Sequence, residues 1–136
     1  MLKEITLDPG PITLLLMNDS PKKIKNIFTK IKNKSISAYV AQPVLIEVYK
    51  HLCIAKGKNF AQSGIIKIMD EYPLKIVEMD KSLIIKAGSL KCSYRTKLSY
   101  TDCVVIAFGL LNKLEIHTTE KNLPEIPKLK LILYHF

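Results

Sequence analysis

The chain has 136 residues, of which 48% are hydrophobic, and its formal net charge at pH 7 is +9. This length suits one domain spanning residues 1–136, and with no membrane-length apolar run and no leader-like N-terminus we expect a soluble, cytoplasmic protein without a membrane partner. The excess of lysine favours a polyanionic partner such as nucleic acid, although a lysine-coated surface without such a partner carries the same charge.

The first half of the chain predicts strands that alternate with helices. Lys3–Leu7 alternates apolar and polar side chains, as a strand does, and it ends at Asp8. The elements expected next are a short helix from Pro11 to Met17, a helix capped by Ser20-Pro21, a strand from Ser35 to Val40 and a helix from about Pro43 to Lys56. Gly57 is typical of a residue that ends a helix.

The second half continues the same alternation. The expected elements are a helix capped by Asn59 that runs to about Glu71, a strand at Pro73–Val77, a helix capped by Asp80 that runs to about Lys91, a helix at Tyr100–Asn112, and strands at Leu114–Thr118 and Leu129–Phe136. This order predicts a three-layer α/β/α fold with a mostly parallel sheet. In such sheets, ligands bind beyond the carboxyl ends of the strands.

Four carboxylates are expected at that rim of the sheet. Asp8 follows the first strand, Glu47 and Asp102 lie in the first turns of two helices, and Glu120 follows the strand that ends at Thr118. Crowded carboxylates repel one another and raise their pKa values, and a divalent cation removes that conflict. Mg²⁺ and Mn²⁺ prefer oxygen ligands, so the pattern indicates a metal site suited to phosphodiester hydrolysis.

Each carboxylate also has a local explanation. Ser99 and Asp102 fit a capping box, in which Asp102 only stabilises the start of its helix. Asp8 precedes a Pro-Gly turn, and Glu120 fits a solvated loop charge. Glu47 and His51 are four residues apart in a helix, and we interpret them as a side-chain contact rather than as two metal ligands.

Three stretches resemble the PIN-domain ribonuclease family. "LSYTDCVVIAFGLLNKLEIHTTEKNL" resembles its C-terminal signature, in which a helix with an aspartate in its first turn is followed by a strand and an acidic turn. "ITLDPGPITLLLM" resembles the opening strand and helix, and "AYVAQPVLIEVYKHL" resembles the helix start that contains a glutamate. Together they cover essentially the whole chain in the order of the family.

The resemblance implies a flavodoxin-like or Rossmann-like sheet and a metal-dependent endoribonuclease that uses Mg²⁺ or Mn²⁺. It implies that Asp8, Glu47 and Asp102 bind the metal, that Glu120 stands where the family has a fourth acid, and that Thr118 positions the site. Many members are small, usually dimeric toxins of VapBC-type toxin–antitoxin modules, in which an antitoxin peptide occupies the cleft. RNA substrate, a cognate antitoxin and a homodimer are therefore the expected partners.

The chain departs from the pattern of the family in two places. Pro9 and Gly10 stand where a nearby threonine or serine is common, and Glu120 is longer than the usual aspartate. These departures keep open an alternative, a PIN-like module with weak nuclease activity that binds RNA or protein. A nucleotide-binding domain is disfavoured because the chain has no glycine-rich phosphate loop.

Arg95 and Lys97 precede the Asp102 helix, where they fit phosphate contacts or solvated loop charges equally well.

Overall fold

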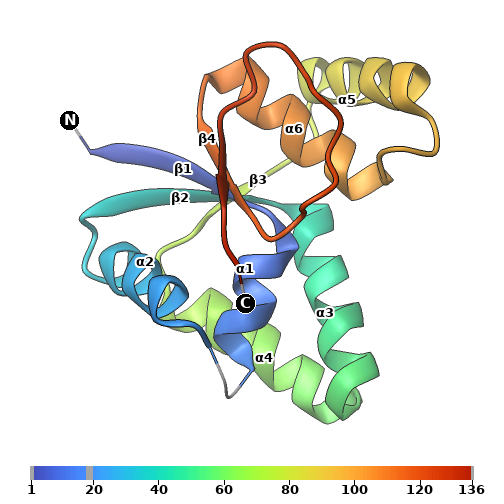
Figure 1. Ribbon diagram of the computed structural model, residues 1–136. Helices are drawn as coiled ribbons and strands as arrows, with labels where there is room; N and C mark the ends of the chain where they lie inside the picture. Colours follow the sequence, from blue (N-terminus) through green and yellow to red (C-terminus); the bar gives the residue numbers. More distant parts are fainter. Residues whose placement is uncertain (1, 18–19, 136) are drawn as a thin grey trace.

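The computed structural model describes residues 2–17 and 20–135 as a three-layer α/β/α fold, as the sequence predicts (Figure 1). In chain order the elements are β1 (Lys3–Leu7), α1 (Pro9–Leu16), α2 (Lys22–Lys32), β2 (Ile36–Ala41), α3 (Gln42–Lys56), α4 (Lys58–Glu71), β3 (Lys75–Val77), α5 (Lys81–Tyr94), α6 (Tyr100–Asn112), β4 (Glu115–Thr118) and β5 (Leu131–Leu133). No helix in these described ranges is long and apolar enough to cross a membrane.

The strands form one sheet in the order β3-β2-β1-β4-β5, and all neighbouring pairs are parallel. Helices α1 to α4 lie on one side of the sheet and α5 and α6 on the other (Figure 1). The order of strands therefore reverses between β1 and β4, because β2 and β3 follow on one side of β1 and β4 and β5 lie on the other. In parallel sheets such a switch point opens a crevice beyond the carboxyl ends of the two strands, and Asp8 directly follows β1 at that position.

The core surrounds the carboxyl half of the central strand β1, from Ile5 to Leu7. Ile5 and Leu7 of β1 are fully buried, because helices cover both faces of the strand. The α6 segment from Cys103 to Ala107 is buried as well, which fixes the backbone at the start of that helix. Burial of each such side chain stabilises the fold by roughly 1.5–3 kcal/mol.

Several helix boundaries differ from the predictions. α1 begins at Pro9 rather than Pro11. Ser20 does not cap α2; its hydroxyl instead donates toward carbonyl oxygens at the end of α1, including that of Leu14 at 2.5 Å. α4 begins at Lys58 after Gly57, whose φ of 90° permits an abrupt turn between two helices, so Asn59 is not the cap. The predicted cap of α5 is confirmed.

The last strand is shorter than the sequence predicts. β5 covers only Leu131–Leu133, and Lys128 in the turn that precedes it adopts a left-handed conformation with φ of 66°. Phe136, the expected last residue of that strand, lies outside the described residues. Cys92 is exposed on α5.

Candidate functional site

Asp8 lies at the switch point of the sheet and is almost completely buried. Its backbone N–H donates to the carbonyl of His117 in β4, which fixes the carboxyl end of β1 against β4. Its side chain is 7% exposed, and the Thr118 hydroxyl donates to its Oδ2 at 2.7 Å. The other oxygen, Oδ1, is buried and has no hydrogen-bond partner in residues 2–17 and 20–135. A buried oxygen left unpaired in this way carries a desolvation cost.

The surroundings of Asp8 make its carboxyl group a weaker acid than an ordinary aspartate side chain. Burial raises the pKa of Asp8 to about 7, against the opposing effect of the Thr118 hydrogen bond. The negative charges of Asp102, Glu47 and Glu120 contribute to this increase, each less than burial does. Each of these three acids is therefore close enough to repel the charge on Asp8.

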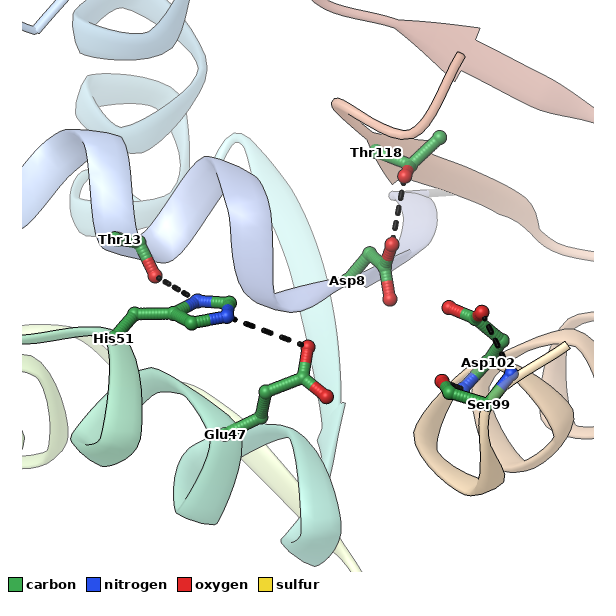
Figure 2. A network of polar contacts seen from close by, with 7 residues as sticks. All are labelled: Asp8, Thr13, Glu47, His51, Ser99, Asp102 and Thr118. Atoms are coloured by element: carbon green, nitrogen blue, oxygen red, sulfur yellow. Dashed lines mark hydrogen bonds and ion pairs between the residues drawn. The ribbon is translucent and has the colours of Figure 1, made fainter. Parts of the chain in front are cut away.

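Asp102 approaches Asp8 from the start of α6, on the opposite face of the sheet from α1 (Figures 1 and 2). Its Oδ2 accepts the backbone N–H of Ser99 at 3.0 Å, and the Ser99 hydroxyl accepts the backbone N–H of Asp102 at 3.0 Å. The capping box suggested by the sequence is thus present. It engages one carboxylate oxygen and leaves Oδ1 of Asp102 outside these two hydrogen bonds.

Glu47 reaches the same space from α3 (Figure 2). Its Oε2 lies 4.0 Å from Nε2 of His51, and Nδ1 of His51 lies 3.4 Å from the hydroxyl of Thr13. The predicted contact between Glu47 and His51 is therefore present. In Figure 2 the carboxylates of Asp8, Glu47 and Asp102 point toward one another from three different elements.

Thr118 and Glu120 connect the end of β4 to the site. The buried Thr118 hydroxyl donates to Asp8 and accepts the backbone N–H of Glu120 at 3.0 Å. This single hydroxyl therefore orients the carboxylate and also fixes the turn that carries the fourth acid. The Glu120 side chain is exposed, which leaves it free to move toward the other acids.

The Pro9-Gly10 departure has a structural reason. A Cβ atom built on Gly10 would lie 2.0 Å from Oγ1 of Thr119, so only glycine allows the start of α1 to pack this closely against the end of β4. The same packing brings Thr118 to Asp8. Thr118 of β4 thus supplies the hydroxyl that Pro9 and Gly10 lack.

A second polar network stabilises β4 and was not expected from the sequence. The ring of His117 is buried, with Nδ1 2.7 Å from the Tyr134 hydroxyl and Nε2 3.3 Å from the Glu115 carboxylate. A neutral ring that donates from Nε2 and accepts at Nδ1 satisfies all three groups. Burial lowers the pKa of His117, which favours that neutral ring. The network connects Tyr134, which follows β5, to β4, the strand that carries Thr118. No sequence motif predicts this network.

Arg95 and Lys97 are exposed in the turn between α5 and α6. Arg95 has a positive φ of 35°, and its carbonyl accepts a hydrogen bond from the side-chain ammonium of Lys91, which helps to hold the turn. Neither cation has an ion-pair partner in the part of the chain that the structure describes. This placement is compatible with phosphate contacts and with simple solvation alike.

The donor set suits a hard divalent cation. Carboxylate oxygens are the ligands that Mg²⁺ and Mn²⁺ prefer, and the unpartnered Oδ1 of Asp8 is an acceptor without a donor. Within residues 2–17 and 20–135, no three His, Cys, Asp or Glu side chains lie close enough together to form a complete ligand set. Mg²⁺ binds through one or two carboxylates and retains several waters, so the observed spacing is compatible with such an ion.

Known structures share this fold over nearly the whole chain. The toxin–antitoxin complex VapBC2 from Rickettsia felis, solved with a promoter DNA fragment, matches with a TM-score of 0.75 and 18% identity, covering 97% of this chain and 99% of that chain. DNA-bound VapBC from Salmonella typhimurium matches with a TM-score of 0.74 and 17% identity over 97% and 98% of the two chains. VapC20 from Mycobacterium tuberculosis, a toxin that cleaves the sarcin-ricin loop, matches with a TM-score of 0.64 and 13% identity over 82% and 86%.

Comparison with curated protein sequences gives no match. The sequence model of the PIN domain matches residues 12–129, a range that includes Glu47, Asp102 and Glu120 and begins four residues after Asp8. The match covers most of the chain, and the all-parallel sheet agrees with it. The chain therefore belongs to the PIN domain family.

Proposed function

We propose that this protein is a metal-dependent endoribonuclease. The observation that carries the proposal is the buried, unpartnered oxygen of Asp8, which faces the carboxylates of Glu47 and Asp102 and has its pKa raised to about 7. A site that only stabilised the fold would gain nothing from crowding like charges around a buried acid. A site that binds Mg²⁺ or Mn²⁺ uses such carboxylate oxygens, and the charge of the cation offsets their repulsion.

Asp8, Glu47 and Asp102 hold the metal in this proposal, and Glu120 either supports a second ion or orients the attacking water. When bound, the cation supplies positive charge that activates water and stabilises the leaving oxygen. Thr118 holds the Asp8 carboxylate in one orientation through its hydrogen bond. Water attacks phosphorus in line, the bond from phosphorus to the 3′ oxygen breaks, and the products carry a 5′-phosphate and a 3′-hydroxyl.

The charge of the chain supports a polyanionic substrate. A net charge of +9 raises the local concentration of RNA around the protein and speeds its association at low salt. Arg95 and Lys97 contact phosphates from the turn before α6. The chain has only one arginine, so we expect lysine contacts to phosphate, rather than guanidinium contacts to bases, to dominate RNA binding.

We further propose that the protein is the toxin of a toxin–antitoxin module in the cytoplasm, where it binds a cognate antitoxin and forms a homodimer. Support comes from the VapBC complexes that share its fold at low identity. Sedimentation of the purified chain tests the homodimer. Co-expression with the product of a short neighbouring gene tests the antitoxin, which is expected to suppress RNA cleavage.

The test of the nuclease compares Asp102→Asn with Ser99→Ala. The asparagine oxygen still accepts the Ser99 N–H and keeps the helix cap, but the charge is lost; we expect RNA cleavage with Mn²⁺ to fall about a hundredfold or more. Ser99→Ala removes the cap hydroxyl, at about 1 kcal/mol in stability, and leaves the carboxylate, so cleavage should persist.

Three other outcomes would contradict the proposal. Equal cleavage by wild type and Asp102→Asn removes this carboxylate from the mechanism. Loss of cleavage in Ser99→Ala alone assigns the effect to the helix cap. Salt-dependent RNA binding without cleavage under Mg²⁺ or Mn²⁺ favours the alternative of a PIN-like binding module with weak nuclease activity.

A further inference from the structure

A cavity lined by several lysines lies away from the carboxylates. A cavity of about 630 Å³ is formed by the end of α6, by α5 and by the segment before β5. Four lysines line it, namely Lys86, Lys113, Lys128 and Lys130. We call this cavity the lysine groove. Because it adjoins the end of α6 and the start of β5, it lies at the opposite rim of the sheet from Asp8 and Asp102.

The lysine groove carries unbalanced positive charge. No acidic residue lines it, and none of its four lysines has an ion-pair partner in residues 2–17 and 20–135. Two of them, Lys113 and Lys128, have left-handed backbones with φ of 55° and 66°. Four ammonium groups around one hollow repel one another, and a polyanionic ligand would relieve that repulsion.

The other lining residues of the groove are apolar. They are Leu110, Leu111, Pro127 and Leu129. Leu111 is 46% exposed, so part of this lining faces solvent. The apolar surface continues into β5, an edge strand whose Leu131, Ile132 and Leu133 are each more than a third exposed. An exposed apolar edge strand is a ready position for an added strand from a partner.

We propose that the lysine groove and the β5 edge together bind an acidic peptide segment that also carries apolar side chains. Acidic side chains of the segment pair with the four lysines, and its apolar side chains cover Leu111 and the β5 edge. The segment belongs to a partner protein and binds in an extended conformation along β5. Because the groove lies away from the carboxylates, this inference is independent of the proposed nuclease activity.

Two other occupants fit the same surface less well. RNA phosphates would satisfy the lysines, but the groove offers no aromatic ring or guanidinium on which bases could stack, and its leucines would stay exposed. A second copy of this chain docked through the same face would bring lysines against lysines. An acidic, partly apolar segment complements both the charge and the apolar surface.

The test measures binding of the full chain to a short capped peptide of alternating leucine and glutamate, with EDTA present. We expect saturable binding by wild type that weakens about tenfold or more in the Lys86→Glu/Lys130→Glu double variant. The matched control is Lys23→Glu/Lys67→Glu, the same charge change at exposed sites on α2 and α4, which should bind within about twofold of wild type. Melting temperatures verify that all three proteins are folded.

Further probes separate the alternatives. A serine–glutamate peptide should bind more weakly than the leucine–glutamate peptide, and Leu111→Ser should weaken only the latter. The proposal fails if wild type does not bind the leucine–glutamate peptide, or if the control variant loses as much affinity as the groove variant. It also fails if the groove variant loses affinity for single-stranded RNA instead, or if sedimentation shows that this variant alone changes the self-association of the chain.

Discussion

Replacing Asp8 by asparagine should change how the stability of the metal-free protein depends on pH. Burial raises the pKa of Asp8 from 3.8 to about 7, so the folded protein keeps a proton on this group that the unfolded chain has released. Between these two pKa values the folded state binds more protons, and its stability therefore falls as pH rises. Above about pH 7 both states are ionised and the loss is complete.

The magnitude follows from the size of the shift. About three pKa units correspond to roughly 4 kcal/mol, of which roughly 3 kcal/mol is lost between about pH 5 and about pH 8. That is a large part of the stability of a small domain. Asparagine cannot ionise, and its side-chain oxygen still accepts the Thr118 hydroxyl, so Asp8→Asn should escape this loss.

The assay is denaturant unfolding in EDTA at a series of pH values for wild type and Asp8→Asn. The difference between the two unfolding free energies is the informative quantity, because groups that do not interact with Asp8 contribute equally to both. We expect the variant to gain roughly 3 kcal/mol over wild type from about pH 5 to about pH 8. Asp70→Asn, at an exposed position on α4, is the matched control and should follow wild type. Parallel curves for wild type and Asp8→Asn would refute the claim that burial keeps this acid protonated.

Three other changes test the same region. Because a metal ligand must be deprotonated, the rise in melting temperature that Mn²⁺ causes should be larger above about pH 7 than at about pH 5, and it should be absent in Asp8→Asn. Thr118→Val removes the donor to Asp8 and should lower RNA cleavage at neutral pH while shifting its pH profile upward; Thr118→Ser should restore both. Gly10→Ala should lower the stability of the fold by about 1–3 kcal/mol, because its Cβ meets Thr119. Gly88→Ala, within α5, adds a Cβ that meets nothing within 4 Å and should be neutral or stabilising; thermal melts measure both.

The sequence predicts the arrangement of the site better than its detailed contacts. Alternating strands and helices imply a parallel sheet, and that topology alone brings the residues after β1 and β4 to one rim. Asp8 and Thr118 are 110 positions apart, yet their contact follows from this rule. The roles of the four acids as ligands stay predictions.

Local rules fail where tertiary packing decides. Ser20 has the residue type of a helix cap, but its hydroxyl donates to carbonyl oxygens at the end of α1 that lie within its reach. The turn before β5 contains Lys128 in a left-handed conformation that lysine seldom adopts, and the sequence pattern does not predict it. The burial of His117 against Tyr134 likewise depends on the position of Tyr134, just after β5, beside β4.

Asp102 shows that a local explanation and a functional one need not exclude each other. A carboxylate has two oxygens, and the capping box engages only Oδ2. Anchoring one oxygen to the Ser99 N–H removes rotational freedom from the side chain, so the remaining oxygen is held near Asp8 before any cation binds. An aspartate preorganised in this way loses less entropy when it binds a ligand than a freely rotating one. Ser99→Pro removes this N–H at a position whose φ of −72° proline can adopt, so it should weaken Mn²⁺ binding modestly, whereas Ser99→Ala keeps the N–H and should bind Mn²⁺ like wild type; calorimetric titration with Mn²⁺ measures the difference. Equal affinity in the two variants would mean that the cap serves only the helix.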